Sequence, residues 1–148
     1  MMRTRNEGLP SHDLLGPASA DEVAVEERLL GVALPPSLQV FLLRHNGGWF
    51  YQTMVRFYSV GPYDYRFSRH NAAIRDEDDS WPAERIAFAT DGGLGVFCFD
   101  AAKRSADGEC PLLYFPWQER RVEPIGPSLD AFLPHLERMA TIRFGVST

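Results

Sequence analysis

Residues 86–100 read IAFATDGGLGVFCFD, in which two apolar runs flank an Asp91-Gly92-Gly93 turn. Short runs rich in aromatic and β-branched residues, bounded by turn residues, are typical of β-strands. An Asp-Gly pair accommodates the positive φ angles of a tight turn. The stretch therefore predicts an antiparallel hairpin with strands at about 85–90 and 95–100.

The glycines of this turn have a second interpretation, as a loop that binds phosphate. Such a loop follows a strand and opens a helix, whose first backbone amides receive the anion. Here the run Val96–Phe99 is strand-like, and Cys98 stands where the third glycine of a dinucleotide motif is needed. The sequence thus favours structural glycines and predicts no cofactor-binding residues.

Strand signals continue on both sides of the hairpin. Residues 49–60 are rich in aromatic and β-branched residues and predict one strand, and two more are expected at about 112–116 and 120–125. Residues 63–84 fit no single pattern, although Ser68–Asp76 could form a short helix. We interpret residues 63–84 as a variable insertion.

Three further helices are predicted from their capping residues and apolar spacing. Ser19-Ala20-Asp21-Glu22 has the spacing of a capping box and precedes a helix over about 20–30. A second helix follows Leu34-Pro35-Pro36-Ser37, because proline is favoured at a helix start. A third begins with Ser128 as its cap, and Pro134 should bend or shorten it.

Together these elements predict an α+β fold with helices packed on a mixed or mainly antiparallel sheet of about five to six strands. The length of 148 residues is typical of one domain, which we expect over residues 18–148. Residues 1–17 mix Gly, Pro, Asn and charges without periodicity, and therefore predict a flexible N-terminal arm.

Composition and charge argue against several classes of function. The formal net charge of -5 disfavours binding to nucleic acid. No apolar run approaches the ~18 residues of a membrane helix, and no apolar segment of a signal peptide follows the first residues. We therefore expect a cytoplasmic protein, with Cys98 and Cys110 as buried free thiols.

The order and spacing of these motifs resemble the SUKH superfamily, over about residues 18–137. The resemblance rests on a helix, the Leu34-Pro35-Pro36-Ser37 turn, a second helix, Asn46-Gly47-Gly48 and then residues 86–100. The later strand-like run Pro111–Phe115 matches the usual ending of the superfamily. The superfamily includes fungal cell-wall synthesis regulators and many bacterial immunity proteins.

This resemblance implies a SUKH-like α+β fold and a role in binding another protein. Bacterial members mostly neutralise toxin domains, often nucleases, of polymorphic toxin systems, whereas the fungal members act as regulatory scaffolds. A small domain fits the bacterial form, so we predict an immunity protein that inhibits one cognate toxin by stoichiometric binding. The alternatives are a regulatory scaffold and an enzyme of unknown activity.

Signatures of catalysis and of metal binding are missing from the sequence. The four histidines and two cysteines contain no pair at zinc-ligand spacing, and no Gly-x-Ser-x-Gly motif is present. We therefore predict no enzyme activity, and neither catalytic nor metal-binding residues.

The partner-binding site is predicted between Tyr63 and Trp81, where the sequence does not resemble the SUKH superfamily. An acidic run would attract a basic toxin surface, and aromatic residues beside it would supply affinity. The predicted residues are Tyr63, Tyr65, Phe67, Asp76, Glu77, Asp78, Asp79 and Trp81. The first helix adds Asp21, Glu22, Glu26 and Glu27 to this acidic face. Trp49, Phe50 and Trp117 are assigned to the core or its rim.

Overall fold

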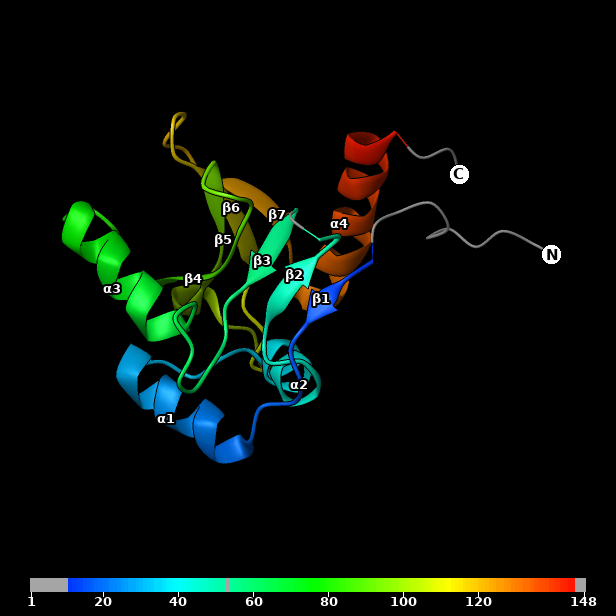
Figure 1. Ribbon diagram of the computed structural model, residues 1–148. Helices are drawn as coiled ribbons and strands as arrows, with labels where there is room; N and C mark the ends of the chain where they lie inside the picture. Colours follow the sequence, from blue (N-terminus) through cyan, green and yellow to red (C-terminus); the bar gives the residue numbers. More distant parts are fainter. Residues whose placement is uncertain (1–10, 53, 146–148) are drawn as a thin grey trace.

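The sheet of this protein is an antiparallel meander of seven strands in sequence order, seen in a computed structural model that describes residues 11–52 and 54–145 (Figure 1). The strands are β1 (Asp13–Leu14), β2 (Gly48–Phe50), β3 (Val55–Phe57), β4 (Arg85–Thr90), β5 (Gly95–Asp100), β6 (Leu112–Pro116) and β7 (Glu123–Gly126). The helices are α1 (Ala20–Leu30), α2 (Pro36–Arg44), α3 (Phe67–Glu77), the short 3-10 helix η1 (Ala101–Lys103) and α4 (Leu129–Phe144). The predicted α+β class is confirmed, with seven strands in place of five or six.

The hairpin predicted from residues 86–100 is formed by β4 and β5. The N–H of Gly95 donates to Asp91 Oδ1 at 2.8 Å and closes the turn. Gly92 and Gly93 have φ angles of 89° and 103°, which residues with a side chain rarely adopt. The glycines of this turn are therefore structural, as predicted.

Residues 49–60 form a hairpin of β2 and β3, so the prediction of a single strand there is wrong. The chain turns at Tyr51 and Gln52, which have φ angles of 50° and 58°. Residues other than glycine seldom occupy this left-handed region. Because the turn contains neither glycine nor proline, no signal in the sequence marks it.

Part of the predicted N-terminal arm belongs to the sheet. Residues 1–10 lie outside the described residues, but β1 pairs with β2 at the sheet edge. The N–H of Leu15 donates to the carbonyl of Gly47 at 3.0 Å, and the N–H of Asn46 donates to that of Gly16 at 2.8 Å. The ordered fold thus begins before Ala18, where the sequence placed its start.

The predicted helices are present, with two differences. Ser19 and Glu22 form the capping box of α1, since the Ser19 hydroxyl accepts from the Glu22 N–H and the Glu22 carboxylate accepts from the Ser19 N–H. Ser128 occupies the cap position of α4, but its side chain makes no capping hydrogen bond. Pro134 does not end α4, which continues to Phe144.

The main core lies on the sheet face that α2 and α4 cover. Phe132 of α4 is fully buried, and its ring centroid lies 5.0 to 6.1 Å from those of Phe57, Phe88 and Phe97 on three strands. Phe41 of α2 packs on the same group, 4.9 Å from Phe57. Because side chains alternate along a strand, the neighbours of these phenylalanines point to the opposite face of the sheet.

That opposite face is bordered by α3, which is tied to β4 by one buried side chain. Asn71, which is 1% exposed, accepts from the Ala87 N–H at 2.8 Å and donates to the Ala87 carbonyl at 3.0 Å. It contacts β4 at Ala87, where the pairing of β4 with β5 shifts register. The Asn71 amide thus takes the place of a neighbouring strand at this residue and fixes α3 against the sheet.

Cys98 and Cys110 are buried free thiols, as predicted. Among the helices that the structure describes, none is both long and apolar enough to cross a membrane.

Candidate partner-binding site

The aromatic residues predicted to bind a partner divide into two kinds. Tyr63 and Tyr65 are 42% and 36% exposed on the segment that leads into α3. Phe67 is fully buried at the start of α3 and packs edge-on against Tyr58, with ring centroids 6.0 Å apart. The prediction that Phe67 anchors a partner is therefore wrong, because a core residue offers no surface.

Trp81 also belongs to the core. It is 6% exposed, and its indole N–H donates to the carbonyl of Arg85 at 2.9 Å. Its ring lies 5.1 Å from Phe115 and 5.9 Å from Trp117. Trp81 thus supports the rings of β6 and the loop after it, and its assignment as a partner anchor is wrong.

The acidic run 76–79, at the C-terminal end of α3, is only partly available to a partner. Asp78 accepts from the N–H and hydroxyl of Ser80 at 3.0 and 2.6 Å, and pairs with Arg120 at 2.7 Å. The Ser80 hydrogen bonds, helped by Arg120, lower the pKa of Asp78. Asp78 therefore has a structural role, whereas Asp76, Glu77 and Asp79 are exposed.

Three of the four acids that α1 was predicted to add to the acidic face are engaged in hydrogen bonds within the fold. Glu22 belongs to the capping box, and Glu26 is 2% exposed and accepts from the Ser68 N–H at 2.6 Å. Glu27 accepts from the Leu34 N–H at 2.7 Å and from Gln39 at 2.9 Å. Glu22 thus caps α1, and Glu26 and Glu27 bind α1 to its neighbours. Asp21 remains exposed, so the buried Glu26 is the clear error in this part of the prediction.

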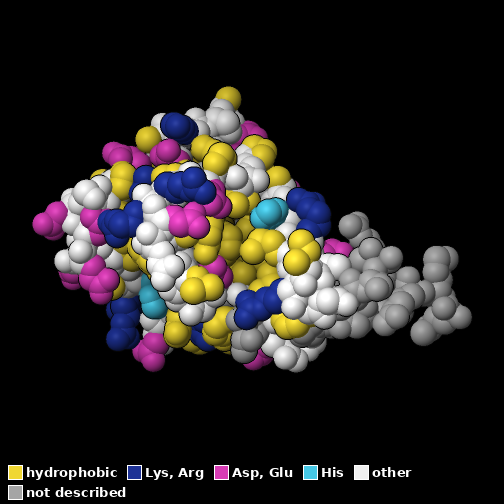
Figure 2. Space-filling view, turned by 90° about the horizontal axis from the view of Figure 1, so that it is seen from above, with side chains coloured by type: hydrophobic (Ala, Val, Ile, Leu, Met, Phe, Trp, Pro, Cys, Tyr) yellow, Lys and Arg dark blue, Asp and Glu magenta, His cyan; other side chains and the backbone are white. Residues whose placement is uncertain are grey.

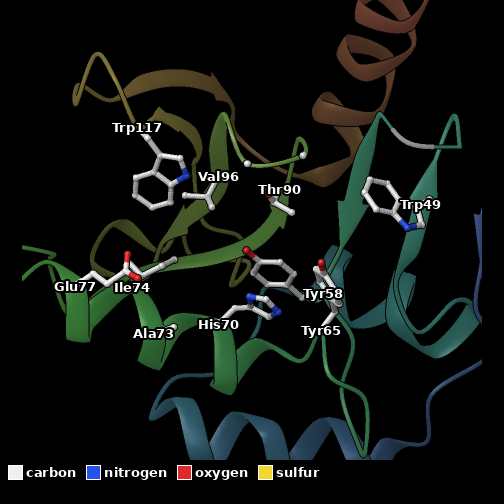
Figure 3. A pocket seen from close by; sticks show the side chains of 12 residues that line it. Trp49, Tyr58, Tyr65, His70, Ala73, Ile74, Glu77, Thr90, Val96 and Trp117 are labelled. Atoms are coloured by element: carbon white, nitrogen blue, oxygen red, sulfur yellow. The ribbon is translucent and has the colours of Figure 1, made fainter.

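A pocket of about 490 Å³ opens on the sheet face opposite the phenylalanine core. Its aromatic side chains and one valine come from β2, the residue after β3, the segment before α3, α3, β5 and the loop after β6 (Figure 3). They are Trp49, Tyr58, Tyr65, His70, Val96 and Trp117, and this group is called the aromatic pocket. Figure 2, seen from above the view of Figure 1, shows hydrophobic side chains gathered in the middle of the molecule with charged side chains around them.

Stacked rings form one wall of the aromatic pocket. His70 lies between two tyrosine rings, 4.6 Å from Tyr58 and 4.8 Å from Tyr65 in centroid distance, with interplanar angles of 16° and 30°. The guanidinium of Arg56 continues the row, 3.9 Å from the Tyr65 centroid and 5.5 Å from that of Trp49. This wall is therefore preorganised by ring stacking and cation–π contacts before any partner arrives.

The titratable groups of this wall favour their neutral forms. Burial lowers the pKa of His70 below its ordinary value, and the nearby Arg69 and Arg56 lower it further. Burial raises the pKa of Tyr58 well above its ordinary value. At neutral pH the wall thus presents an uncharged imidazole and an uncharged phenol beside the charged Arg56.

The lowered pKa of His70 makes stability depend on pH. The unfolded chain takes up a proton near its ordinary pKa of 6.5, above the folded value, so the stabilisation is complete above pH 6.5 and is lost as the pH falls through the folded pKa. The pKa values of His12 and His135 are lowered in the same direction by burial. We therefore expect a smaller free energy of unfolding at about pH 5.5 than at about pH 7.5.

Urea denaturation of the wild type and of His70→Phe at both pH values checks this expectation. Phenylalanine keeps the stacked ring but cannot titrate, so the variant should lose less stability on acidification than the wild type does. An equal or larger loss in His70→Phe would contradict the assigned role of His70.

Several lining residues of the pocket escaped the sequence prediction. Trp49 and Trp117 were assigned to the core or its rim, and both are partly exposed at the pocket. Tyr58 and His70 were not singled out for binding. The alternation of Arg56 and Tyr58 with the buried Val55 and Phe57 was the available signal, because it places the former two on one face.

The described residues contain no group of three or more His, Cys, Asp or Glu side chains that could hold a metal ion.

The sequence model of the SMI1/KNR4 family (SUKH-1) matches residues 17–135. A comparison with individual curated proteins finds no match. Because the family match covers far more than half of the 148 residues, the chain belongs to the SMI1/KNR4 family (SUKH-1).

Proposed function

We propose that this protein is an immunity protein, which binds one cognate toxin domain in equal stoichiometry and blocks its activity. The observation that carries the proposal is the aromatic pocket, an open concave surface with partly exposed tryptophans on opposite sides, Trp49 and Trp117 (Figure 3). Membership of the SMI1/KNR4 family supports it, since the superfamily includes many immunity proteins.

The residue types around the pocket suit a protein partner. Trp, Tyr and Arg carry much of the binding energy in protein interfaces, because they bury large areas with few rotatable bonds or make several directed contacts. Trp49, Trp117, Tyr65 and Arg56 bring these types together on one face. Tyr63, exposed on the same segment as Tyr65, extends this set.

Charge near the pocket supports a basic partner. The exposed Asp76 and Glu77 end α3, the exposed Asp79 lies two residues beyond it, and Glu77 also lines the pocket. The chain as a whole has a net charge of -5. Acidic side chains at the rim of an interface speed the approach of a basic partner, such as a nuclease domain, more than they strengthen the final complex.

Co-expression tests the proposal. The chain is produced in bacteria together with the C-terminal toxin domain of a large secreted protein encoded beside its gene. We expect the cells to survive and the two proteins to purify as a one-to-one complex. If every such neighbouring domain kills the cells and none co-purifies with the chain, the proposal is wrong. If the chain instead binds proteins of the host cell and does not protect the cells from any toxin domain, it is a regulatory scaffold.

A further inference from the structure

An arginine without an acidic partner among the described residues, Arg56, lies against two rings that line the aromatic pocket, Trp49 and Tyr65. Arg56 pairs across the sheet with Trp49 on one side and with Thr90 on the other, and both partners line the pocket. Cross-strand partners project from the same face of a sheet, so the Arg56 side chain lies on the pocket side. Within residues 11–52 and 54–145, the Arg56 side chain forms neither an ion pair nor a hydrogen bond, and its Nε is buried without a partner.

The contacts that Arg56 does make leave the terminal N–H groups of its guanidinium without a hydrogen-bond partner in the part of the chain that the structure describes. Its guanidinium lies over the rings of Tyr65 and Trp49, at 3.9 and 5.5 Å from their centroids. Stacking uses the flat face of a guanidinium, whereas its N–H groups point outward along the edges. The ring contacts therefore hold the cation in place while its hydrogen-bonding edge remains available for a bidentate acceptor.

The hydroxyl of Tyr58, close to Arg56 on the same face, also has no hydrogen-bond partner within the described ranges. Tyr58 lies two residues further along, on the same face, and is 2% exposed. Its hydroxyl forms no hydrogen bond to any described residue and points into the pocket (Figure 3). Burial raises its pKa, so the hydroxyl keeps its proton and is a donor at neutral pH.

The neighbouring turn adds backbone donors to this set. Gly92 and Gly93 line the pocket, and their N–H groups make no hydrogen bond to the described part of the chain. The lining residue Glu77 lies across the pocket from Tyr65 and Trp49 (Figure 3), so no carboxylate neutralises Arg56. A cationic ligand is disfavoured at this end, because Arg56 already covers the aromatic faces and would repel it.

We propose that this end of the aromatic pocket binds a carboxylate, presented by the partner protein as an aspartate or glutamate side chain next to an apolar residue. Arg56 and Tyr58 donate to the carboxylate oxygens, with the amides of Gly92 and Gly93 beside them, and the apolar neighbour packs on Trp49, Val96 or Trp117. The inference rests on the proposed function for the identity of the partner, but its chemistry is testable without one. The volume of about 490 Å³ is within the range of about 300 to 1,000 Å³ usual for ligand pockets.

A matched pair of dipeptides tests the inference. The probes are N-acetyl-Phe-Glu-amide and N-acetyl-Phe-Gln-amide, which differ in charge and hardly in shape. Binding is followed by the fluorescence of Trp49 and Trp117 and by amide shifts in NMR spectra of the full chain. We expect the glutamate probe to bind about tenfold or more tightly than the glutamine probe, because charged hydrogen bonds exceed neutral ones.

Four variants assign the effect to residues. Arg56→Gln should remove the preference for glutamate, Tyr58→Phe should weaken it while keeping the ring stack, and Arg28→Gln on the exposed side of α1 should leave it unchanged. Arg56→Lys, which keeps the charge but not the planar fork, should give an intermediate value. Circular dichroism confirms that each variant is folded.

Equal affinity for the two probes, no saturable binding of the glutamate probe, or an undiminished preference in folded Arg56→Gln would overturn the inference. Because the assay contains no toxin, a failure of protection in cells leaves this result intact, and a failure here leaves the proposed immunity function standing.

Discussion

Replacing Asn71 by leucine is expected to lower the free energy of unfolding by about 3 kcal/mol or more. The Asn71 amide satisfies both the N–H and the carbonyl of Ala87, and also donates to the carbonyl of Phe67 at 2.9 Å. Leucine has a similar volume but offers no donor or acceptor. Two buried backbone groups of Ala87 would lose their partners, each at a cost of about 1 to 3 kcal/mol.

Urea denaturation measures this effect, and an exposed amide supplies the control. Gln118 lies in the loop after β6, where an exposed amide-to-leucine change leaves no buried group unsatisfied. Gln118→Leu should therefore change the free energy of unfolding by less than about 0.5 kcal/mol. If Asn71→Leu were as stable as the wild type, the account of how α3 is fixed to β4 would be wrong.

The second large effect concerns binding. Replacing both Trp49 and Trp117 by alanine is expected to weaken binding to the cognate toxin at least about 100-fold, since buried tryptophans at interfaces commonly contribute about 2 kcal/mol or more each. The two rings line the aromatic pocket from opposite sides (Figure 3), so a partner that fills the pocket contacts both. Calorimetric titration measures the loss of affinity.

Exposed apolar residues away from the pocket provide matched controls for the tryptophans. Leu29 on α1 and Ile142 on α4 are 63% and 82% exposed and do not line the pocket, and their replacement by alanine should leave the affinity unchanged. The change of Asp76 and Asp79 to asparagine should mainly slow association and reduce its salt dependence. A double tryptophan variant that binds as tightly as the wild type would place the interface elsewhere.

Local signals in the sequence predicted much of the fold correctly. The β4–β5 hairpin and the α1 capping box depend on residues within five positions of one another, whose chemistry can be read directly. The turn between β2 and β3 could not be predicted, because Tyr51 and Gln52 adopt left-handed φ angles that these residue types rarely take. Strand β1 has only two residues, too few for a periodic pattern.

The site was harder to predict because its properties arise from tertiary contacts. Glu26 and Ser68 are 42 positions apart, and no local pattern shows that this carboxylate is buried beneath α3. The aromatic pocket combines residues from Trp49 to Trp117, which only the sheet brings together. Tyr63 and Tyr65 are exposed whereas Phe67 and Trp81 are buried, although all four are aromatic residues of one segment.

An immunity protein of the kind proposed inhibits its toxin by binding to it, one molecule to one. The most direct test adds increasing amounts of the purified chain to a fixed amount of its cognate toxin domain, well above the dissociation constant, and measures the remaining toxin activity. We expect toxin activity to fall linearly, to reach zero at one equivalent of the chain and to stay there, with no dependence on time. Full toxin activity at several equivalents, or progressive loss of activity at a small fraction of one equivalent as an enzyme would produce, would contradict it.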